Sequence, residues 1–321
     1  MQRIGLAVVA CGPRRAAALV VALALPMVGP GLAVAQARGG GVAVASSATP
    51  TGNDISYPQC GSAFPAAPAF GIVGINDGLA NTLNPCLGPS SSYPSYTRSE
   101  LYWAVASTTG ATTQPKASLY VNTADPGNVY RRSPIKDWPT SGTTPYGSCT
   151  TTRVTIGHTT YTLGQNSTAC AWQYGYNKAA QDAAWLSGAA TAIDTQLNAS
   201  VVSSAVGTYP WWLDVETANT WQSGSSGQAM NVTDLQGMLA ALQSAGATTL
   251  GAYSTASQWA TVTGGTTTSA SGSLYGLADW IPGATTLAGA QANCGLPPFT
   301  GAVGKVSLTQ WAATFDNDYA C

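Results

Sequence analysis

The sequence predicts an α/β fold, an irregular TIM-like β/α barrel that forms a single domain over residues 53–321. Strand-like apolar runs alternate with helical patterns, which is typical of a parallel sheet covered by helices. The chain of 321 residues is long enough for one closed barrel with a full core. The last third is rich in strands and leaves little room for helices between them, so we expect the barrel to be irregular.

The expected elements follow one another along the chain in strand–helix alternation. The strand-like runs are 54–57, 70–76, 117–123, 211–216, 249–255, 277–283 and 305–312. An Ala-rich, mostly helical segment spans 169–197, and an amphipathic helix is predicted over 231–246. Asn231 is the expected N-cap of that second helix, and Gly246 its C-terminal glycine. Residues 125–168, rich in Pro, Gly and Thr, are expected to form a long insertion.

The N-terminus has the layout of a secretory signal peptide, expected over residues 1–37. Three arginines precede an apolar run that ends in small residues. An uncleaved membrane anchor is the alternative, but Pro and Gly interrupt the run, whereas a spanning helix needs about 20 apolar residues in succession. Residues 38–52 read as a flexible leader. We therefore expect a secreted protein without stable membrane association.

The cysteines indicate disulfides rather than a metal site. Six of the seven remain after the signal is removed, and an even number is typical of an exported, disulfide-bonded chain. We favour the sequential pairing because each bridge then closes a modest loop. The pairs are Cys60–Cys86, Cys149–Cys170 and Cys294–Cys321. No Cys-x-x-Cys is present and the sole histidine is His158, so we expect no metal and no cofactor.

Charge is scarce, and this bounds the partners. Charged residues make up 8% of the chain, with 12 bases and 13 acids, and three of the bases leave with the signal. No basic stripe remains, which argues against nucleic acid. The 10 Trp and 14 Tyr on an uncharged polar background suit contact with neutral glycans. Filling the core is the alternative role for these rings.

Asp214 and Glu216 follow a run of aromatic and apolar residues, where charge is costly. In a strand, residues i and i+2 share one face, and inward side chains at the C-terminal strand ends of a barrel form its active site. Two such carboxylates suit cleavage of a glycosidic bond: one stays protonated and donates to the leaving oxygen, while the other is ionised and stabilises or attacks the cation. The alternative is a pair that caps a helix or holds an arginine.

Other acids are expected at the same opening. Asp54 lies at the start of the first predicted strand, and Asp316 and Asp318 come just after the last. Because the first and last strands of a closed barrel are neighbours, Asp54 and Asp316 are expected to reach Asp214 and Glu216. Turn-forming roles are the alternative for the aspartates outside the central pair.

Three motifs resemble the family 25 glycoside hydrolases, secreted lysozymes that cut the sugar backbone of peptidoglycan. Residues 52–59, GNDISYPQ, match the family's opening Gly-x-Asp-[Ile/Val]-Ser-x-x-Gln, and residues 213–216, LDVE, match its central Leu-Asp-[Leu/Val]-Glu. Residues 309–311, TQW, followed by Phe315 and Asp316, resemble its late Trp-Gln-Tyr strand and aspartate. The resemblance extends over residues 53–321.

The resemblance implies five β/α units followed by three strands. It implies that Glu216 is the general acid, that Asp214 orients the substrate's N-acetyl group or stabilises the cation in a retaining mechanism, and that Asp54 and Asp316 support the site. The candidate substrate-binding residues are Tyr57, Asn76, Asn122, Tyr253, Trp280 and Trp311. Core packing is the alternative for the aromatic residues among them. The implied partner is a cell-wall glycan, bound by a monomer that is secreted or associated with the cell wall.

The second and third predicted strands depart from the family's pattern. Asn76 and Asp77 stand where typical members have a lysine or another charged residue, and residues 119–123 read LYVNT where Tyr-His-[Phe/Tyr] is usual. We therefore expect a divergent branch of exported bacterial proteins with an altered rim. Two hypotheses follow: a glycoside hydrolase acting on peptidoglycan or a related glycan, and a non-catalytic cell-surface protein that keeps the barrel and binds glycan.

Overall fold

The computed structural model describes residues 51–106, 108–110, 112–128, 137–265 and 269–321. The expected signal peptide and most of the expected leader lie outside these residues. The first strand begins at Thr51, so the end of the segment expected as a leader already belongs to the folded domain.

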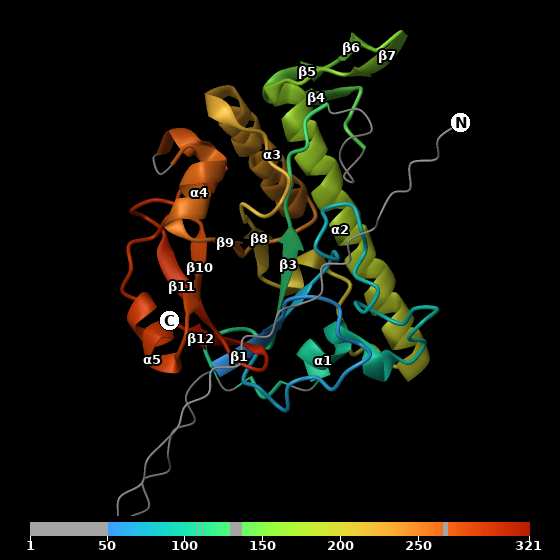
Figure 1. Cartoon of the computed structure of the whole chain (residues 1–321). Coiled ribbons are helices and arrows are strands. Elements are labelled where there is room, and N and C mark those ends of the chain that lie inside the picture. Colours follow the sequence, from blue (N-terminus) through green and yellow to red (C-terminus); the bar gives the residue numbers. More distant parts are fainter. Residues whose placement is uncertain (1–50, 107, 111, 129–136, 266–268) are drawn as a thin grey trace, which may run out of the picture. The chain divides into compact units, whose positions relative to one another are not determined.

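Eight strands close into a barrel, which confirms the α/β barrel expected from the sequence (Figure 1). In chain order they are β1 (Thr51–Ile55), β2 (Gly71–Gly74), β3 (Ala117–Asn122), β8 (Trp211–Asp214), β9 (Leu250–Tyr253), β10 (Ala278–Ala284), β11 (Lys305–Ala312) and β12 (Asp316–Ala320). Neighbouring strands from β1 to β11 run parallel. The last strand, β12, is antiparallel to both β11 and β1 and closes the barrel.

Helices connect most of the parallel strands. They are α1 (Glu100–Ala106), α2 (Thr168–Leu197), α3 (Gly224–Ser244), α4 (Ala256–Thr263) and α5 (Leu287–Asn293), with short 3₁₀ helices at Tyr96–Arg98, Val206–Thr208 and Ser269–Leu274. In the described residues the connection from β1 to β2 holds no α-helix, and α1 is the first. Both α4 and α5 lie in the last third, where the sequence was expected to leave little room, because helices of 8 and 7 residues suffice to connect these strands.

The second predicted helix is longer than expected. Helix α3 begins at Gly224 with Ser223 as its N-cap, so Asn231 lies inside the helix and is not its cap. The buried Asn231 side chain instead donates to the backbone oxygens of Gln222 (2.9 Å) and Val262 (2.8 Å). The glycines and serines at the start of α3 suggest a loop, and packing overrides that preference. Gly246, expected at the C-terminal end, follows the helix with φ +104°.

Two hydrophobic layers hold the barrel. Outward-facing strand residues, among them Leu213 and Val215, pack with the helices in the larger layer. The barrel interior is a smaller cluster of Phe70, Ile72, Tyr120, Trp212, Trp280, Leu308 and Ala320. The orientation of Leu213 and Val215 toward the helices, expected from strand alternation, is confirmed.

Glycines at inward positions make room for the large rings of the interior. A Cβ on Gly251 would lie 2.3 Å from the Trp212 ring, and one on Gly74 would lie 2.7 Å from the Tyr120 ring. The rings therefore cross the barrel where a larger residue would block them. They form the floor on which the polar residues above them stand.

The three disulfides are those expected: Cys60–Cys86, Cys149–Cys170 and Cys294–Cys321. They are typical of a secreted or extracellular protein. In the described part of the insertion, two hairpins form, β4 (Gly142–Thr144) with β5 (Gly147–Cys149) and β6 (Thr151–Ile156) with β7 (Thr159–Gly164). The bridge from Cys149 to Cys170 holds this insertion to the N-terminal end of α2, as predicted (Figure 1).

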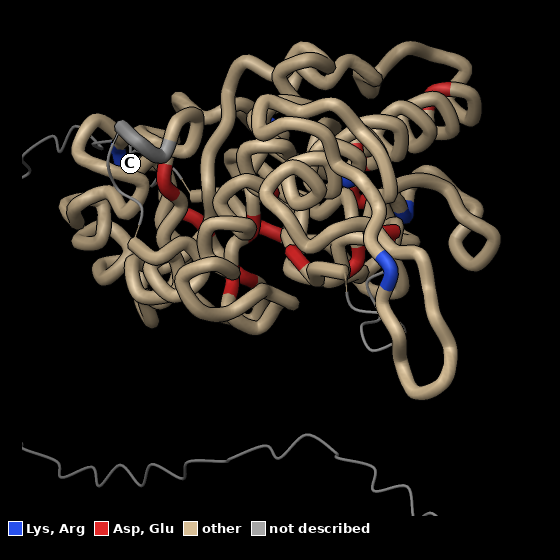
Figure 2. The backbone as a smooth tube through the Cα atoms, turned by 90° about the horizontal axis from the view of Figure 1, so that it is seen from above, with Lys and Arg blue, Asp and Glu red and all other residues tan. Residues whose placement is uncertain are grey.

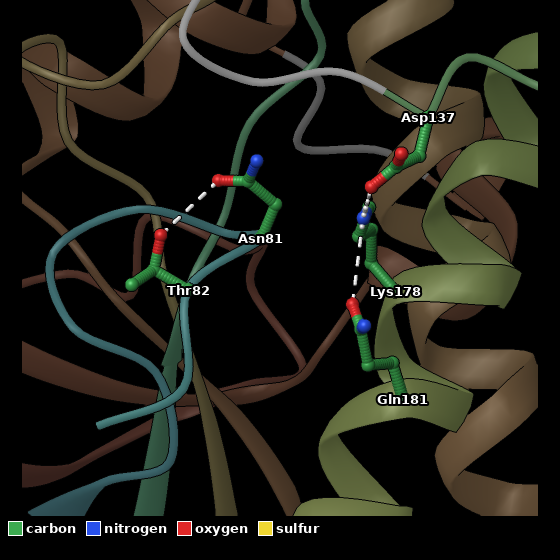
Figure 3. Close-up of polar contacts among 5 residues, drawn as sticks. All are labelled: Asn81, Thr82, Asp137, Lys178 and Gln181. Atoms are coloured by element: carbon green, nitrogen blue, oxygen red, sulfur yellow. Dashed lines mark hydrogen bonds and ion pairs between the residues drawn. The ribbon is translucent and has the colours of Figure 1, made fainter. Parts of the chain in front are cut away.

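Helix α2 also contacts the insertion at Asp137. Lys178 of α2 forms an ion pair with Asp137 of the insertion (2.8 Å) and donates to Gln181 (3.4 Å) (Figure 3). Figure 3 also shows a contact between the neighbouring side chains of Thr82 and Asn81, which belong to the loop after β2. Across the described ranges, no helix combines the length and the apolar character needed to cross a membrane.

Candidate active site

A cavity of about 150 Å³ opens at the C-terminal ends of the parallel strands. It is lined by Asp54, Ser56, Tyr120, Asn122, Asp214, Glu216, Tyr253, Trp280, Gln310 and Asp316. Seven of the ten residues predicted for the site are therefore brought together, including all four acids. This is the end of the barrel where the sequence placed the site.

Asp214 and Glu216 share the cavity, as strand alternation predicted. Strand β8 ends at Asp214, two residues earlier than expected. The backbone N–H of Val215 still donates to the carbonyl of Tyr253 (2.9 Å), so the chain continues along β9 in extended form. Glu216 consequently faces the same opening as Asp214.

Asp54 and Asp316 are direct partners across the β1–β12 pair. The Ser56 hydroxyl lies between them, with Asp54 Oδ1 at 3.2 Å and a short contact to Asp316 Oδ2. Gln310 donates from Nε2 to Asp54 Oδ2 (2.8 Å) and accepts at Oε1 from the Tyr253 hydroxyl (3.0 Å). The expected closeness of first and last strands is confirmed, and Asp316 and Asp318 belong to a strand rather than to a C-terminal turn.

Asp214 is almost fully buried, and its carboxyl has spare hydrogen-bonding capacity. Asp214 Oδ1 has no hydrogen-bond partner in the described part of the chain. Asp214 Oδ2 accepts from the Asn122 amide at 3.0 Å when that amide turns its nitrogen toward the acid, and the Asn122 oxygen then accepts from the Gly78 N–H at 3.2 Å. Burial, and then the charges of Glu216 and Asp54, raise the pKa of Asp214 well above its usual value.

Glu216 is half-buried at the cavity rim. Burial raises the pKa of Glu216, while a hydrogen bond from Gln258 opposes the rise. The Gln258 side chain is itself fixed, because its Oε1 accepts from the backbone N–H of Thr217 (2.7 Å). The Glu216 carbonyl accepts from the indole of Trp221 (2.8 Å), which fixes the backbone at this position.

Aromatic rings form one wall and the floor. Tyr253 and Trp280 meet edge to face with ring centroids 4.5 Å apart, and the Tyr120 hydroxyl donates to the carbonyl of Ile55 (3.0 Å). The Trp280 indole donates to Asp318 Oδ1 (2.8 Å) beneath the cavity. Each ring is therefore held by a contact of its own, and the wall does not depend on a ligand.

Three predicted site residues lie elsewhere. Tyr57 is 67% exposed, outside the cavity lining. Asn76 is buried behind Asn122, and its Oδ1 accepts from the Asn122 backbone N–H (2.7 Å). Trp311 follows the inward-facing Gln310 along β11, so its side chain points to the opposite face of the sheet.

Ser56, Tyr120 and Gln310 line the cavity although none was predicted. Ser56 and Tyr120 each stand two residues from a predicted site residue, Asp54 and Asn122, and Gln310 stands next to the predicted Trp311. Counting inward positions from Asp54 and from Asn122 would have found Ser56 and Tyr120.

The cavity is acidic. Figure 2 shows acidic positions gathered around the middle of the tube. In the part of the chain that the structure describes, the lining contains four carboxyl groups and no Lys, Arg or His. No group of three or more His, Cys, Asp or Glu suited to a metal ion is present within the described ranges.

Comparison of the chain with protein-family models, curated proteins and solved structures finds no match.

Proposed function

We propose that this chain is a secreted glycoside hydrolase, lysozyme-like, that cleaves peptidoglycan or a related cell-wall glycan with paired carboxylates. The observation that carries the proposal is the convergence of Asp54, Asp214, Glu216 and Asp316 on one cavity beside two aromatic rings. These acids come from three segments far apart in the sequence. A set of solvated surface acids would have no reason to meet in this way.

We further propose that the barrel is an irregular TIM-like β/α barrel related to that of the family 25 hydrolases. The run of parallel strands from β1 to β11 and the position of the cavity at their C-terminal ends support this relationship. The antiparallel β12 is the irregular element. It supplies Asp316 to the site.

Glu216 is the proposed general acid. A general acid must hold a proton at the working pH and must reach the leaving oxygen. Burial raises the pKa of Glu216, and its half-buried position at the rim leaves it accessible to substrate. Among the described residues, the contact that opposes this rise is the hydrogen bond from Gln258, which orients the carboxyl.

Asp214 is the proposed partner that orients the substrate or stabilises the cation. Asp214 Oδ1 has no hydrogen-bond partner among the described residues and can accept a hydrogen bond from the substrate, while Asn122 donates to Asp214 Oδ2. Before substrate binds, burial and two neighbouring acids favour the protonated form of Asp214. Positive charge developing on a sugar ring beside it would favour the ionised form, so the carboxylate is stabilised most in the transition state.

The surroundings suit a neutral sugar. Tyr253 and Trp280 offer apolar faces, and no basic side chain from the described ranges lines the cavity to bind an anionic group. Neither the loop over residues 81–89 nor the described part of the insertion contributes to the lining. The cavity is therefore not filled by that loop or by the described part of the insertion, which favours the enzyme over a barrel that only binds glycan.

The decisive experiment digests purified cell walls with the mature protein and with Glu216→Gln, which keeps the size of the side chain and removes the acid. Asp77→Asn is the matched control, because it removes a nearby charge from outside the cavity. Reducing ends are counted and soluble fragments are analysed by mass. The wild type and Asp77→Asn should release reducing sugar at similar rates, and Glu216→Gln should release it at least about 100-fold more slowly.

Equal release from the wild type and Glu216→Gln would refute the assigned role of Glu216. No release from any variant, with binding to walls retained, would refute the hydrolase and favour a non-catalytic glycan-binding protein.

A further inference from the structure

Beneath Asp54, outside the cavity lining, lies a further acid. Asp318 stands on β12 two residues beyond Asp316, and it pairs in register with Gln310 on β11 and Gly52 on β1. Its side chain is fully buried. The same alternation that brings Asp316 to the cavity directs Asp318 into the barrel one step deeper.

The two oxygens of Asp318 have different surroundings. Asp318 Oδ1 accepts from the Trp280 indole N–H at 2.8 Å. Asp318 Oδ2 receives no hydrogen bond from any donor in the described residues, and the Asp54 carboxyl lies within hydrogen-bonding reach of the Asp318 side chain. Two carboxylates cannot hydrogen-bond one another, so this contact requires a proton on one of them.

The hydrogen bonds decide which acid holds that proton. Asp54 Oδ2 accepts from Gln310 Nε2 (2.8 Å), and Asp54 Oδ1 is 3.2 Å from the Ser56 hydroxyl. Asp54 is thus surrounded by donors, which favour its ionised form. Asp318 has one donor and a free oxygen, which suits a protonated acid that donates to Asp54.

We propose that Asp54 and Asp318 share one proton, that Asp318 is its holder, and that Asp318 is thereby a positioning residue for the Asp54 carboxylate in the cavity. No basic side chain of the described residues acts on the pair. The titratable groups that face it are Asp316 on β12, Asp214 on β8, Tyr120 on β3 and Tyr253 on β9. The effect on catalysis rests on the proposed hydrolase function, whereas the shared proton does not.

The shift directions agree with this assignment. Burial, the charge of Asp54 and the hydrogen bond to it raise the pKa of Asp318 well above its usual value. The pKa of Asp54 rises only to about 6, because the hydrogen bonds from Gln310, Asp318 and Ser56 oppose burial and the charge of Asp316.

The first test measures unfolding equilibria of the whole chain, disulfides intact, as a function of pH. The variants are Asp318→Asn, Asp54→Asn and the double substitution. An asparagine at 318 keeps an acceptor for Trp280 and a donor for Asp54, so the barrel should still fold. Above about pH 6, where Asp54 is ionised, the native pair holds one proton that the unfolded chain has lost, so stability falls as pH rises. One proton changes the unfolding constant tenfold per pH unit.

Above about pH 6 we expect Asp318→Asn to remove that one-proton slope and the double variant to match it, while Asp54→Asn keeps the slope because burial still holds the proton on Asp318. Asp279→Asn is the control, since Asp279 is a buried acid on β10 whose oxygens accept from Phe299 and Thr300 and from no other donor in the described residues. Its effect should add to that of Asp318→Asn. An unchanged slope in Asp318→Asn, or a loss of the slope in Asp54→Asn alone, would overturn Asp318 as the holder of the proton.

Two further measurements guard the result. Carboxyl ¹³C NMR of the wild type should show two aspartate signals that titrate in common steps, and it applies even where a variant does not fold. With cell walls as substrate, Asp318→Asn should keep kcat/KM within about fivefold of the wild type at its optimum, while Asp318→Leu, which offers no donor, should lower it at least tenfold. Equal kcat/KM for Asn and Leu would refute the positioning role and leave the pH result untouched.

Discussion

Glu100 offers a test of the fold's electrostatics at a site outside the cavity lining. It is fully buried at the start of α1. Its Oε1 accepts from the Gln59 backbone N–H and its Oε2 from the Asn84 amide, both at 2.7 Å. Burial outweighs these two hydrogen bonds and raises the pKa of Glu100 from 4.5 to about 7.

The sign follows from proton binding. Between pH 4.5 and 7 the native state holds a proton on Glu100 that the unfolded chain has released, so the stability due to this group falls as pH rises. A difference of about 2.5 pKa units corresponds to about 3 kcal/mol lost between pH 4 and pH 8. Glu100→Gln removes this titration. It also leaves one buried N–H donor without an acceptor, which costs about 1–3 kcal/mol at every pH.

The stabilities of the two proteins should therefore approach each other or cross. At pH 4 the wild type is expected to be more stable by about 1–3 kcal/mol, and by pH 8 the difference should have moved by about 3 kcal/mol in favour of Glu100→Gln. Urea unfolding at a series of pH values measures both, and equal m values establish that the same surface is exposed. A difference that stays constant from pH 4 to pH 8 would refute the account of Glu100 given above.

Other predictions concern the floor, the insertion and the rim. Gly251→Ala should destabilise the barrel by about 1–3 kcal/mol in urea, because its Cβ would lie 2.3 Å from the Trp212 ring. Replacing Cys149 and Cys170 by serine opens a loop of separation 21 and should cost about 3 kcal/mol by thermal unfolding, with wall digestion by the remaining folded protein unchanged. Ser56→Ala removes a hydrogen bond that lowers the pKa of Asp54, so carboxyl NMR should show the pKa of Asp54 above about 6. An unchanged pKa would contradict the hydrogen bond between Ser56 and Asp54.

Much of the barrel was predictable because its strands are buried and apolar. The strand that the sequence failed to indicate, β12, reads DNDYA, and its polarity is the reason. Asp316 and Asp318 occupy its inward positions, where the chemistry of the cavity replaces the apolar residues that identify a strand. A functional strand thus looks like a turn when only hydrophobicity is considered.

The short helices α4 and α5 each begin after a threonine that caps the helix. Thr255 and Thr286 each accept from a backbone N–H three residues on, at Gln258 and Gly289, and so cap α4 and α5. A threonine before a short apolar run therefore marked both helices. Helix α3 begins earlier than predicted, because its first turns are held by packing rather than by helix propensity.

The four acids were predictable from strand alternation and ring closure, two rules of geometry. Trp311 was assigned to the site because of its aromatic character, and alternation from Gln310 places it on the other face. The hydrogen-bond partners of the acids could not be predicted. They depend on the register between β1, β11 and β12, which a sequence pattern does not contain.

Closure by β12 has a consequence for how the protein acquires its fold. The Asn53 side chain of β1 bonds to β12 across 263 residues, and the neighbouring pair on the other side of β12 is a hairpin with β11. Loop closure of that length is slow, so we expect folding to be limited by the joining of its earliest and latest strands. Until then, β1 and β11 present open edges that can pair with other chains. A chain that crosses a membrane unfolded and completes its barrel afterwards would keep those edges apart during export.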